Sequence, residues 1–472
     1  MLSSIRKYYV TSIIIKNCCR TLVTEVNQDN VTSKKVVPAK KKKSFKTVTE
    51  PKTLKALEKH FKASEQKFVL QTFPEVLLKK RTRLPNGFYL TNKKMARVIA
   101  DELIKDIRPE QSLLEMNPGA GLLTKILLKE TENDLFLYEP LEHFHPALKS
   151  LIKSHPERNI SLSNKDFSTI SYMALVDKID GGNRISELLK GVQRTDYVNE
   201  PNARLFGATS SISFINALIN SVIFQNSVTA AGRCEYFLII PPWIFITLTC
   251  SNEAGYMVYR TISVLFQLLF EYEFIQKVSS EDLLPWQVEV KKMPYNKMGK
   301  FYLMDHDSMY LIRATPRQNI FEYCQPDNLT SLWHFIKQNF RRRKNCIIPT
   351  LEKWIPGCGP RLIINEKSES PPELINPQLD LDSQPKLCQP CRKLSNEDFI
   401  NMTIFTQFGD LTPNQALTIF DQFINWPEFK DSTFKESLEA TLVKIHTNPD
   451  DNINVDDDIH DDEDETKTSE VS

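Results

Sequence analysis

Residues 113–124 read Leu113-Leu114-Glu115-Met116-Asn117-Pro118-Gly119-Ala120-Gly121-Leu122-Leu123-Thr124. An apolar run ends in an acid, a Pro-Gly-x-Gly turn follows, and a helical pattern then begins. A strand of a doubly wound α/β sheet presents its C-terminal end to a nucleotide-like ligand in this way. The glycines permit a tight turn and a close approach of the ligand, because they carry no Cβ. Such glycine pairs also occur in ordinary turns, so the motif alone leaves a purely structural turn open.

Strand-like and helix-like segments alternate on both sides of this turn. We expect strands at 112–116, 134–139, 160–164, 203–206, 235–240, 300–304 and 309–315, and helices at 142–153, 214–224 and 256–270. The last two strands flank a turn and form an antiparallel hairpin. The alternation predicts an α/β fold with a doubly wound, mostly parallel sheet and an antiparallel edge hairpin.

The chain divides into five segments by composition. Residues 80–322 form the predicted α/β domain, with a polar insertion at 176–200, and 323–447 form a small helical C-terminal domain with a Pro-rich loop at 368–392. Within the C-terminal domain, we expect helices at 329–340, 395–405 and 412–426. The remaining segments, 1–24, 25–79 and 448–472, are set apart by their charge.

The net charge is only +1, but it is distributed unevenly. Residues 1–100 hold 23 Lys and Arg against 6 Asp and Glu, whereas residues 450–472 hold 1 against 11. Residues 1–24 contain basic, hydroxylated and apolar residues and no acid, which predicts a mitochondrial presequence, with a disordered basic start as the alternative. Residues 25–79 read as a basic, largely disordered arm with a helix at 51–63, and 448–472 as a disordered acidic tail.

The cysteines and the apolar runs exclude two classes of protein. Of the nine cysteines, only Cys388 and Cys391 have the spacing of metal ligands, and no second pair completes a zinc site. We therefore expect no metal and reduced thiols. The best apolar run, 236–250, is interrupted by two prolines and is too short to span a bilayer, so we expect no membrane partner.

Acidic residues follow the next strands and extend the ligand site. Glu139 ends the second strand, where a carboxylate can accept hydrogen bonds from both ribose hydroxyls of a nucleoside cofactor. Asp166, after the third strand, can accept from an adenine amine, with Phe167 against the ring, and we expect Leu90 on a helix that covers the ligand. The predicted cofactor pocket comprises Leu90, Glu115, Asn117, Gly119, Gly121, Glu139, Asp166 and Phe167.

In this order, Tyr89-Leu90-Thr91-Asn92, the motif 115–124, Glu139 and Asp166-Phe167 resemble the ribosomal RNA adenine dimethylase family. That family binds S-adenosylmethionine and methylates adenine N6 twice, so the resemblance implies this cofactor and a sheet of the S-adenosylmethionine-dependent methyltransferase type. Asn117, where many dimethylases carry glycine, and residues 309–321 are closer to a mitochondrial branch, the mitochondrial transcription factor B proteins. The resemblance covers residues 80–360 and again 395–445.

One departure from the family pattern concerns catalysis. Dimethylases place an Asn-Leu-Pro-Tyr-like motif after the fourth strand, where the Asn oxygen and a carbonyl accept the hydrogens of the adenine amine and the aromatic ring stacks on the base. This chain has Gly207-Ala208-Thr209-Ser210 instead. Gly207 offers no side-chain acceptor and Ser210 no stacking face. We therefore name no catalytic residue and expect a retained fold with weak or absent methyl transfer.

For function, the resemblance implies transcription initiation in the mitochondrial matrix nucleoid. Such a factor binds the single-subunit mitochondrial RNA polymerase as a monomer and helps to hold promoter DNA open. The alternative is an S-adenosylmethionine-dependent dimethylase of the ribosomal RNA of the mitochondrial small subunit, which Glu139 and Asp166 keep open. A third class, a generic small-molecule methyltransferase, is disfavoured by the basic arm and the helical C-terminal region.

Binding of unpaired DNA needs basic side chains and exposed aromatic rings. Arg341, Arg342, Arg343 and Lys344 follow Phe340, with Trp333 and His334 upstream on the same predicted helix. We interpret this segment as a nucleic-acid contact. A solvated basic helix end, favoured by the helix dipole, remains the alternative.

Overall fold

The computed structural model describes residues 51–63, 66–79, 85–253, 255–286, 305, 307–363, 388–396 and 402–447. The chain separates into two compact units, 1–49 and 50–472, and every described residue lies in the second. The predicted presequence, the acidic tail and the strand at 300–304 lie outside the described residues.

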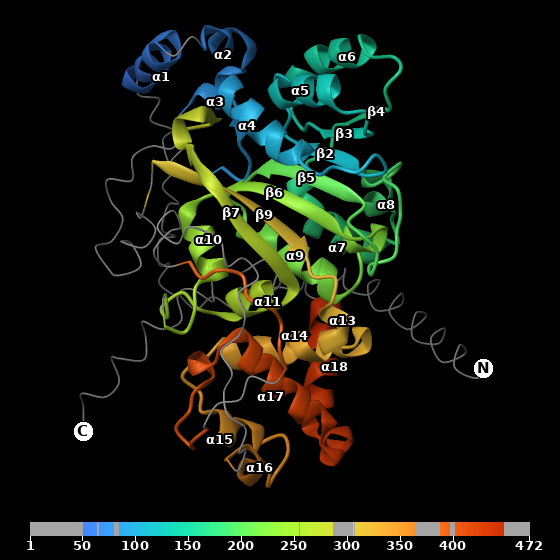
Figure 1. The fold of residues 1–472 in the computed structure, drawn as a ribbon, viewed down its shortest axis with the longest axis vertical. Coiled ribbons are helices and arrows are strands. Elements are labelled where there is room, and N and C mark those ends of the chain that lie inside the picture. Colours follow the sequence, from blue (N-terminus) through green and yellow to red (C-terminus); the bar gives the residue numbers. More distant parts are fainter. Residues whose placement is uncertain are drawn as a thin grey trace, which may run out of the picture. The chain divides into compact units, whose positions relative to one another are not determined.

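Within the described residues, the main sheet has seven strands in the order β4-β3-β2-β5-β6-β9-β7 (Figure 1). Their bounds are β2 Ser112–Met116, β3 Leu135–Tyr138, β4 Ile160–Ser163, β5 Ala203–Ala208, β6 Cys234–Ile240, β7 Phe270–Ser279 and β9 Ser308–Pro316. Strands β2 to β6 pair in parallel, and β9 pairs antiparallel with both β6 and β7. The predicted doubly wound, mostly parallel sheet with an antiparallel edge is therefore confirmed.

The edge hairpin is made of different segments from those expected. Strand β9 was predicted, but its edge partner is β7, whose first residue was assigned to the end of a helix at 256–270. The helix, α11, spans Thr261–Leu269, and β7 starts directly at Phe270. From there burial alternates, with Phe270, Tyr272 and Phe274 inside. This period of two distinguishes a half-buried strand from a continuing helix.

Helices cover both faces of the sheet (Figure 1). On one face lie α4 Lys93–Ile104, α5 Leu122–Glu130 and α6 His145–Lys153; on the other lie α7 Ile170–Asp180, α9 Ile212–Ile223, α10 Pro242–Thr249 and α11. Neighbouring residues of β2 face opposite cores, because Leu113 packs with the first set and Leu114 with the second. The polar segment 176–200 contributes the end of α7 and a short helix, α8 Arg184–Leu188.

The second half of the basic arm contains the helix expected at 51–63, followed by two further short helices. It forms α1 Pro51–Ala63, α2 Lys67–Thr72 and α3 Glu75–Leu78. Leu57 and Phe61 are buried, and the Phe61 ring lies 5.8 Å from that of Trp286. This apolar stripe packs the helix against the domain.

The C-terminal region is helical. It contains α13 Ile320–Tyr323, α14 Pro326–Phe340, α15 Ile347–Leu351, α16 Gly359–Ile363, α17 Pro413–Asn425 and α18 Thr433–Thr447. Helix α17 begins where predicted, with Thr412 and Gln415 forming a capping box. The helix expected at 395–405 is absent from the part of that range that is described, 395–396 and 402–405. No helix among the described segments is both long and apolar enough to cross a membrane.

Candidate cofactor and acceptor-base site

The candidate site lies at the C-terminal ends of β2 and β5, on either side of the point where the strand order reverses. Open α/β sheets bind ligands in the crevice at such a switch point. The turn after β2 and the stretch Gly207–Ser210, which includes the last two residues of β5, lie at this edge because both strands are parallel. The sequence-predicted cofactor turn and acceptor-base stretch are therefore brought to the same edge of the sheet.

The turn after β2 uses left-handed backbone at three positions. Asn117, Gly119 and Gly121 have φ values of 52°, 56° and 69°. A Cβ on Gly119 would lie 3.0 Å from Cδ1 of Tyr89, so this glycine allows the tyrosine ring to cross the turn. Tyr89 belongs to the short strand β1, Tyr89–Leu90, which pairs with β8, Leu283–Leu284.

Glu139 is completely buried and already engaged by three protein donors. Its Oε1 accepts hydrogen bonds from the Tyr89 hydroxyl at 3.0 Å and the Leu141 N–H at 2.8 Å. Its Oε2 accepts from the Gly119 N–H at 2.9 Å. Burial raises the pKa of Glu139, and the hydrogen bonds from Leu141, Gly119 and Tyr89 oppose that rise. This carboxylate is hydrogen-bonded to the glycine turn through Gly119, and the sequence analysis foresaw neither Gly119 nor Tyr89 as its partner.

Glu115 also lies inside the fold. Its Oε2 accepts a hydrogen bond from the Thr124 hydroxyl at 2.7 Å, which joins β2 to the first turn of α5. Burial raises its pKa to about 8, and the nearby Glu139 charge adds to the rise. The contact that the structure gives Glu115 is thus internal, between strand and helix.

Three other predicted pocket residues differ in their burial and in the elements that carry them. Asp166 is half-buried and its Oδ1 accepts from the Ser168 N–H and hydroxyl at 2.9 and 2.7 Å. Phe167 is buried, with its ring 4.8 Å from that of Tyr138, so it does not lie open to an adenine as expected. Leu90 lies on strand β1, and not on a covering helix as predicted, because its segment pairs with β8.

The acceptor-base stretch is hydrogen-bonded to residues 85–88, the segment that precedes β1. The Thr209 hydroxyl donates to the Asn86 carbonyl at 2.6 Å, and the Ser210 hydroxyl to the Pro85 carbonyl at 2.6 Å. The Phe88 N–H donates to the Ala208 carbonyl at 2.9 Å, and Gly87 and Thr209 form an antiparallel bridge. The Thr209 and Ser210 hydroxyls and the Ala208 carbonyl therefore form hydrogen bonds within the protein.

Gly207 is closed off by packing. A Cβ built at this position would lie 2.7 Å from Sδ and 3.3 Å from Cβ of Met116, on the neighbouring strand β2. No side chain fits there without displacing a buried residue. An asparagine at Gly207, the position expected to correspond to the motif asparagine, would have to displace the Met116 side chain.

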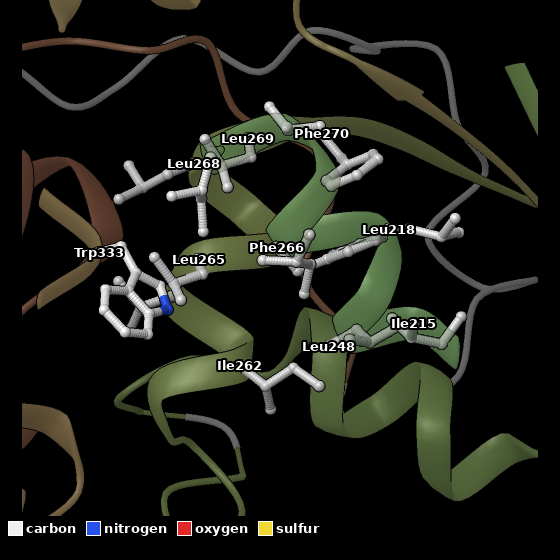
Figure 2. Close-up of a cluster of buried hydrophobic side chains, with 14 of the residues drawn as sticks. Ile215, Leu218, Leu248, Ile262, Leu265, Phe266, Leu268, Leu269, Phe270 and Trp333 are labelled. Carbon is white, nitrogen blue, oxygen red and sulfur yellow. The ribbon is translucent and has the colours of Figure 1, made fainter. Parts of the chain in front are cut away.

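The predicted nucleic-acid segment divides into buried and exposed residues. Trp333 is only 5% exposed and packs in the core beside Leu265, as Figure 2 shows. Arg343 is also buried, with its guanidinium 4.2 Å from the Tyr256 ring centroid and a hydrogen bond of 3.0 Å to the Met257 carbonyl. Both are corrections, because the amphipathic helix α14 and the turn after it direct these side chains inward. The exposed cations are Arg341, Arg342 and Lys344.

An exposed aromatic residue lies on a different segment from the one predicted. Phe405 is 76% exposed and follows the exposed Ile404. Its segment is joined to the cationic one by hydrogen bonds from Ile347 N–H to the Thr406 carbonyl at 2.9 Å and from Phe408 N–H to the Asn345 carbonyl at 3.1 Å. We call Arg341, Arg342, Lys344, Ile404 and Phe405 the basic–aromatic surface. Sequence spacing gave no signal for this long-range pairing.

The cysteine pair with metal-like spacing lies inside the protein. Cys388 and Cys391 are buried free thiols, and burial raises the pKa of Cys388 to about 12. Arg317 donates to Cys391 Sγ at 3.4 Å. In the described segments, no group of three His, Cys, Asp or Glu side chains is arranged to hold a metal.

The strand order, the antiparallel edge, the glycine turn after β2 and the acid after β3 together define a methyltransferase-type α/β fold. Residues 78–357 match the family model described as Ribosomal RNA adenine dimethylase, and the chain belongs to this family.

The relatives refine this placement. The chain is 42% identical over 384 residues to a Drosophila melanogaster protein named Dimethyladenosine transferase 2, mitochondrial, covering 79% of this chain and 84% of that protein. It is 27% identical over 283 residues to the Homo sapiens protein of the same name, covering 57% and 68%. A crystal structure of a Plasmodium falciparum dimethyladenosine transferase matches with 11% identity and a TM-score of 0.39, covering 71% and 98%. The resemblance to the mitochondrial branch is confirmed.

Proposed function

We propose that this protein is a mitochondrial transcription initiation factor that uses a dimethylase fold as a scaffold. It binds the single-subunit mitochondrial RNA polymerase as a monomer and stabilises melted promoter DNA in the matrix nucleoid. Methyl transfer is weak or absent. The names of the mitochondrial relatives support the compartment, and the state of the acceptor-base stretch supports the loss of catalysis.

That state is the observation that carries the proposal. An adenine amine is a poor nucleophile, so a dimethylase must accept its hydrogens and hold the ring. Here Gly207 provides no side-chain acceptor. The hydroxyls of Thr209 and Ser210 donate hydrogen bonds to the carbonyls of Asn86 and Pro85. Using these hydroxyls to hold a base would require breaking their part-buried hydrogen bonds, each worth about 1 kcal/mol.

The cofactor half of the site fits S-adenosylmethionine better than the acceptor half fits a base. Gly119 and Gly121 would pass under the ligand, Glu139 would accept from its ribose, and Asp166 from the adenine amine. The cofactor, when bound, supplies an electrophilic methyl group. The proposal therefore includes a retained pocket whose ligand contributes to folding or regulation and turns over slowly.

The basic–aromatic surface supports binding of unpaired nucleic acid. Its cations attract phosphates, and a ring that is 76% exposed offers a stacking platform. Backbone hydrogen bonds join the two segments, so the cations and the ring belong to neighbouring stretches of the surface. A solvated helix end would not require an exposed aromatic neighbour.

The terminal segments complete the proposal by their charge. Residues 1–24 act as a presequence, the remaining basic arm approaches nucleic acid, and the acidic tail keeps the chain soluble. The α/β domain at 80–322 and the helical region at 323–447 carry the proposed contacts with polymerase and promoter DNA.

Run-off transcription with purified mitochondrial RNA polymerase tests the proposal. A promoter template that is closed in the absence of this protein should yield specific transcripts when the full chain is added. A pre-melted template should reduce the dependence on the protein, because the opening step has been supplied. No stimulation on either template would reject the proposal.

The second candidate, a ribosomal RNA adenine dimethylase, is favoured by the family membership and by the intact contact between Glu139 and the glycine turn. Transfer of tritiated methyl groups from S-adenosylmethionine to a small-subunit ribosomal RNA hairpin distinguishes the two. Turnover comparable to that of an active dimethylase would establish the second candidate.

A further inference from the structure

Tyr89 occupies a position in the cofactor half of the site that the proposed function does not explain. Its hydroxyl donates to Glu139 Oε1, and its ring lies against the face of Gly119 where a Cβ would come within 3.0 Å. Glu139 is the carboxylate that would accept the ribose hydroxyls of a nucleoside. Tyr89 therefore competes with a ligand for the same acceptor.

The number of acceptor positions decides the outcome of this competition. A carboxylate has about four lone-pair sites, two on each oxygen. Tyr89 and Leu141 take both sites of Oε1, and Gly119 takes one site of Oε2. One site is then left for a ligand, whereas two ribose hydroxyls require two.

Tyr89 is held in place from several sides. Strand β1 pairs with β8 through the register Tyr89–Leu284, and the Thr91 hydroxyl donates to the Asp282 carbonyl at 2.8 Å. The Tyr89 ring also packs 5.3 Å from that of Phe144. A side chain fixed by this backbone pairing and packing does not swing aside at low energetic cost.

We propose that Tyr89 is a specificity-determining residue that takes one ribose position at Glu139, so that the site holds an adenosine-type ligand through a single ribose hydroxyl. The inference rests on the retained cofactor pocket of the proposed function. Its consequence is weak binding and poor discrimination between ribose and deoxyribose forms of the ligand. Removing the tyrosine hydroxyl restores the second acceptor position.

The test is isothermal titration of the full chain with S-adenosylhomocysteine and with its 2′-deoxy and 3′-deoxy analogues. The variants are Tyr89→Phe and, as a matched control, Tyr197→Phe, which removes a buried tyrosine hydroxyl that donates to the Arg317 carbonyl at 3.0 Å. We expect Tyr89→Phe to bind S-adenosylhomocysteine about tenfold more tightly, the effect of one hydrogen bond to a charged group. The gain should shrink for one or both deoxy analogues, and Tyr197→Phe should bind as the unmodified chain does.

Equal or weaker binding by Tyr89→Phe, no detectable binding by either protein, or an equal gain for all three ligands would overturn the inference. Run-off transcription is measured on the same preparations. Stimulation that persists in Tyr89→Phe while binding is unchanged rejects only the role of Tyr89. Loss of stimulation by the unmodified chain rejects the proposed function.

Discussion

The Thr209 hydroxyl donates a hydrogen bond to the Asn86 carbonyl over 2.6 Å. This contact joins the end of β5 to the segment before β1, which is 123 residues away in the sequence. It closes the edge of the sheet at which a dimethylase would hold its acceptor base. Three residues after Asn86, Tyr89 donates a hydrogen bond to Glu139. The segment 85–89 therefore contacts both halves of the candidate site.

We expect that Gly207→Asn does not restore methyl transfer, although it restores the residue type of the dimethylase motif. The new side chain would collide with Met116, whose Sδ lies 2.7 Å from the position of a Cβ. Overpacking of this kind lowers the free energy of unfolding by about 1–3 kcal/mol. Urea unfolding and tritium incorporation measure the two effects.

Gly181→Asn is the matched control. Gly181 caps α7 with φ 69°, and nothing lies within 4 Å of a Cβ built there, so asparagine is tolerated in this left-handed position. Unchanged stability of Gly207→Asn, or measurable turnover, would show that the β5 edge is more open than the packing indicates.

Glu115 should make the protein less stable as the pH rises. Its pKa is raised from 4.5 to about 8 by burial, so the folded chain holds a proton that the unfolded chain releases above pH 4.5. The free energy of unfolding then falls between pH 4.5 and about 8, in total by a few kcal/mol, and is constant above that range for this group. Glu115→Gln keeps an acceptor for Thr124 and should remove this slope.

Denaturant titrations between pH 5 and 8 provide the measurement. The exposed Glu157→Gln is the control and should retain the slope of the unmodified chain. A Glu115→Gln protein with an unchanged pH dependence would mean that Glu115 is ionised in the fold.

Much of the sheet could be predicted because its signals are local. The first strand, 112–116, coincides with β2, since a continuous apolar run between turns marks a strand buried on both faces. The capping box at Thr412 fixed the start of α17 for the same reason. Strand β7 was missed because an apolar helix runs into it without a Gly or Pro boundary, and only its alternating burial separates the two.

The candidate site was only half predictable. Glu139 and the glycines follow strand ends, so a one-dimensional pattern places them. The closure by residues 85–88 and the partnership of Tyr89 with Glu139 depend on pairings across more than 40 residues, which the sequence does not encode locally. Trp333 was interpreted as a surface contact but is buried. An aromatic residue next to a basic cluster gives the same sequence pattern whether its ring faces the solvent or the core.

His334 should make the C-terminal helices sensitive to acid. It is fully buried, its ring lies 5.2 Å from that of Phe434, and its Nε2 lies 3.2 Å from the Ser437 hydroxyl. Burial lowers its pKa to about 4, and the Lys337 charge contributes. Because the unfolded histidine takes up a proton near pH 6.5 and the folded one does not, stability is lost as the pH falls from 6.5 to about 4.

His334→Gln should flatten the acid limb of the stability profile, as followed by tryptophan fluorescence, since Trp333 and Trp354 lie in the same core. The exposed His143→Gln serves as the control. If His334→Gln and the unmodified chain lose stability in parallel below pH 6.5, another group governs the acid limb.

The basic–aromatic surface should bind single-stranded DNA through two separable effects. Phe405→Ala removes a stacking platform, so affinity should fall by roughly tenfold with little change in salt dependence. Arg342→Gln with Lys344→Gln removes two exposed cations, so the slope of log affinity against log salt should decrease in magnitude by about 1.4. The controls are Tyr172→Ala, an aromatic residue that is 58% exposed elsewhere, and the paired exposed changes Lys129→Gln and Lys153→Gln. Fluorescence anisotropy at several salt concentrations measures both effects. If the control variants lower the affinity as much as the test variants do, the binding is nonspecific and does not depend on this surface.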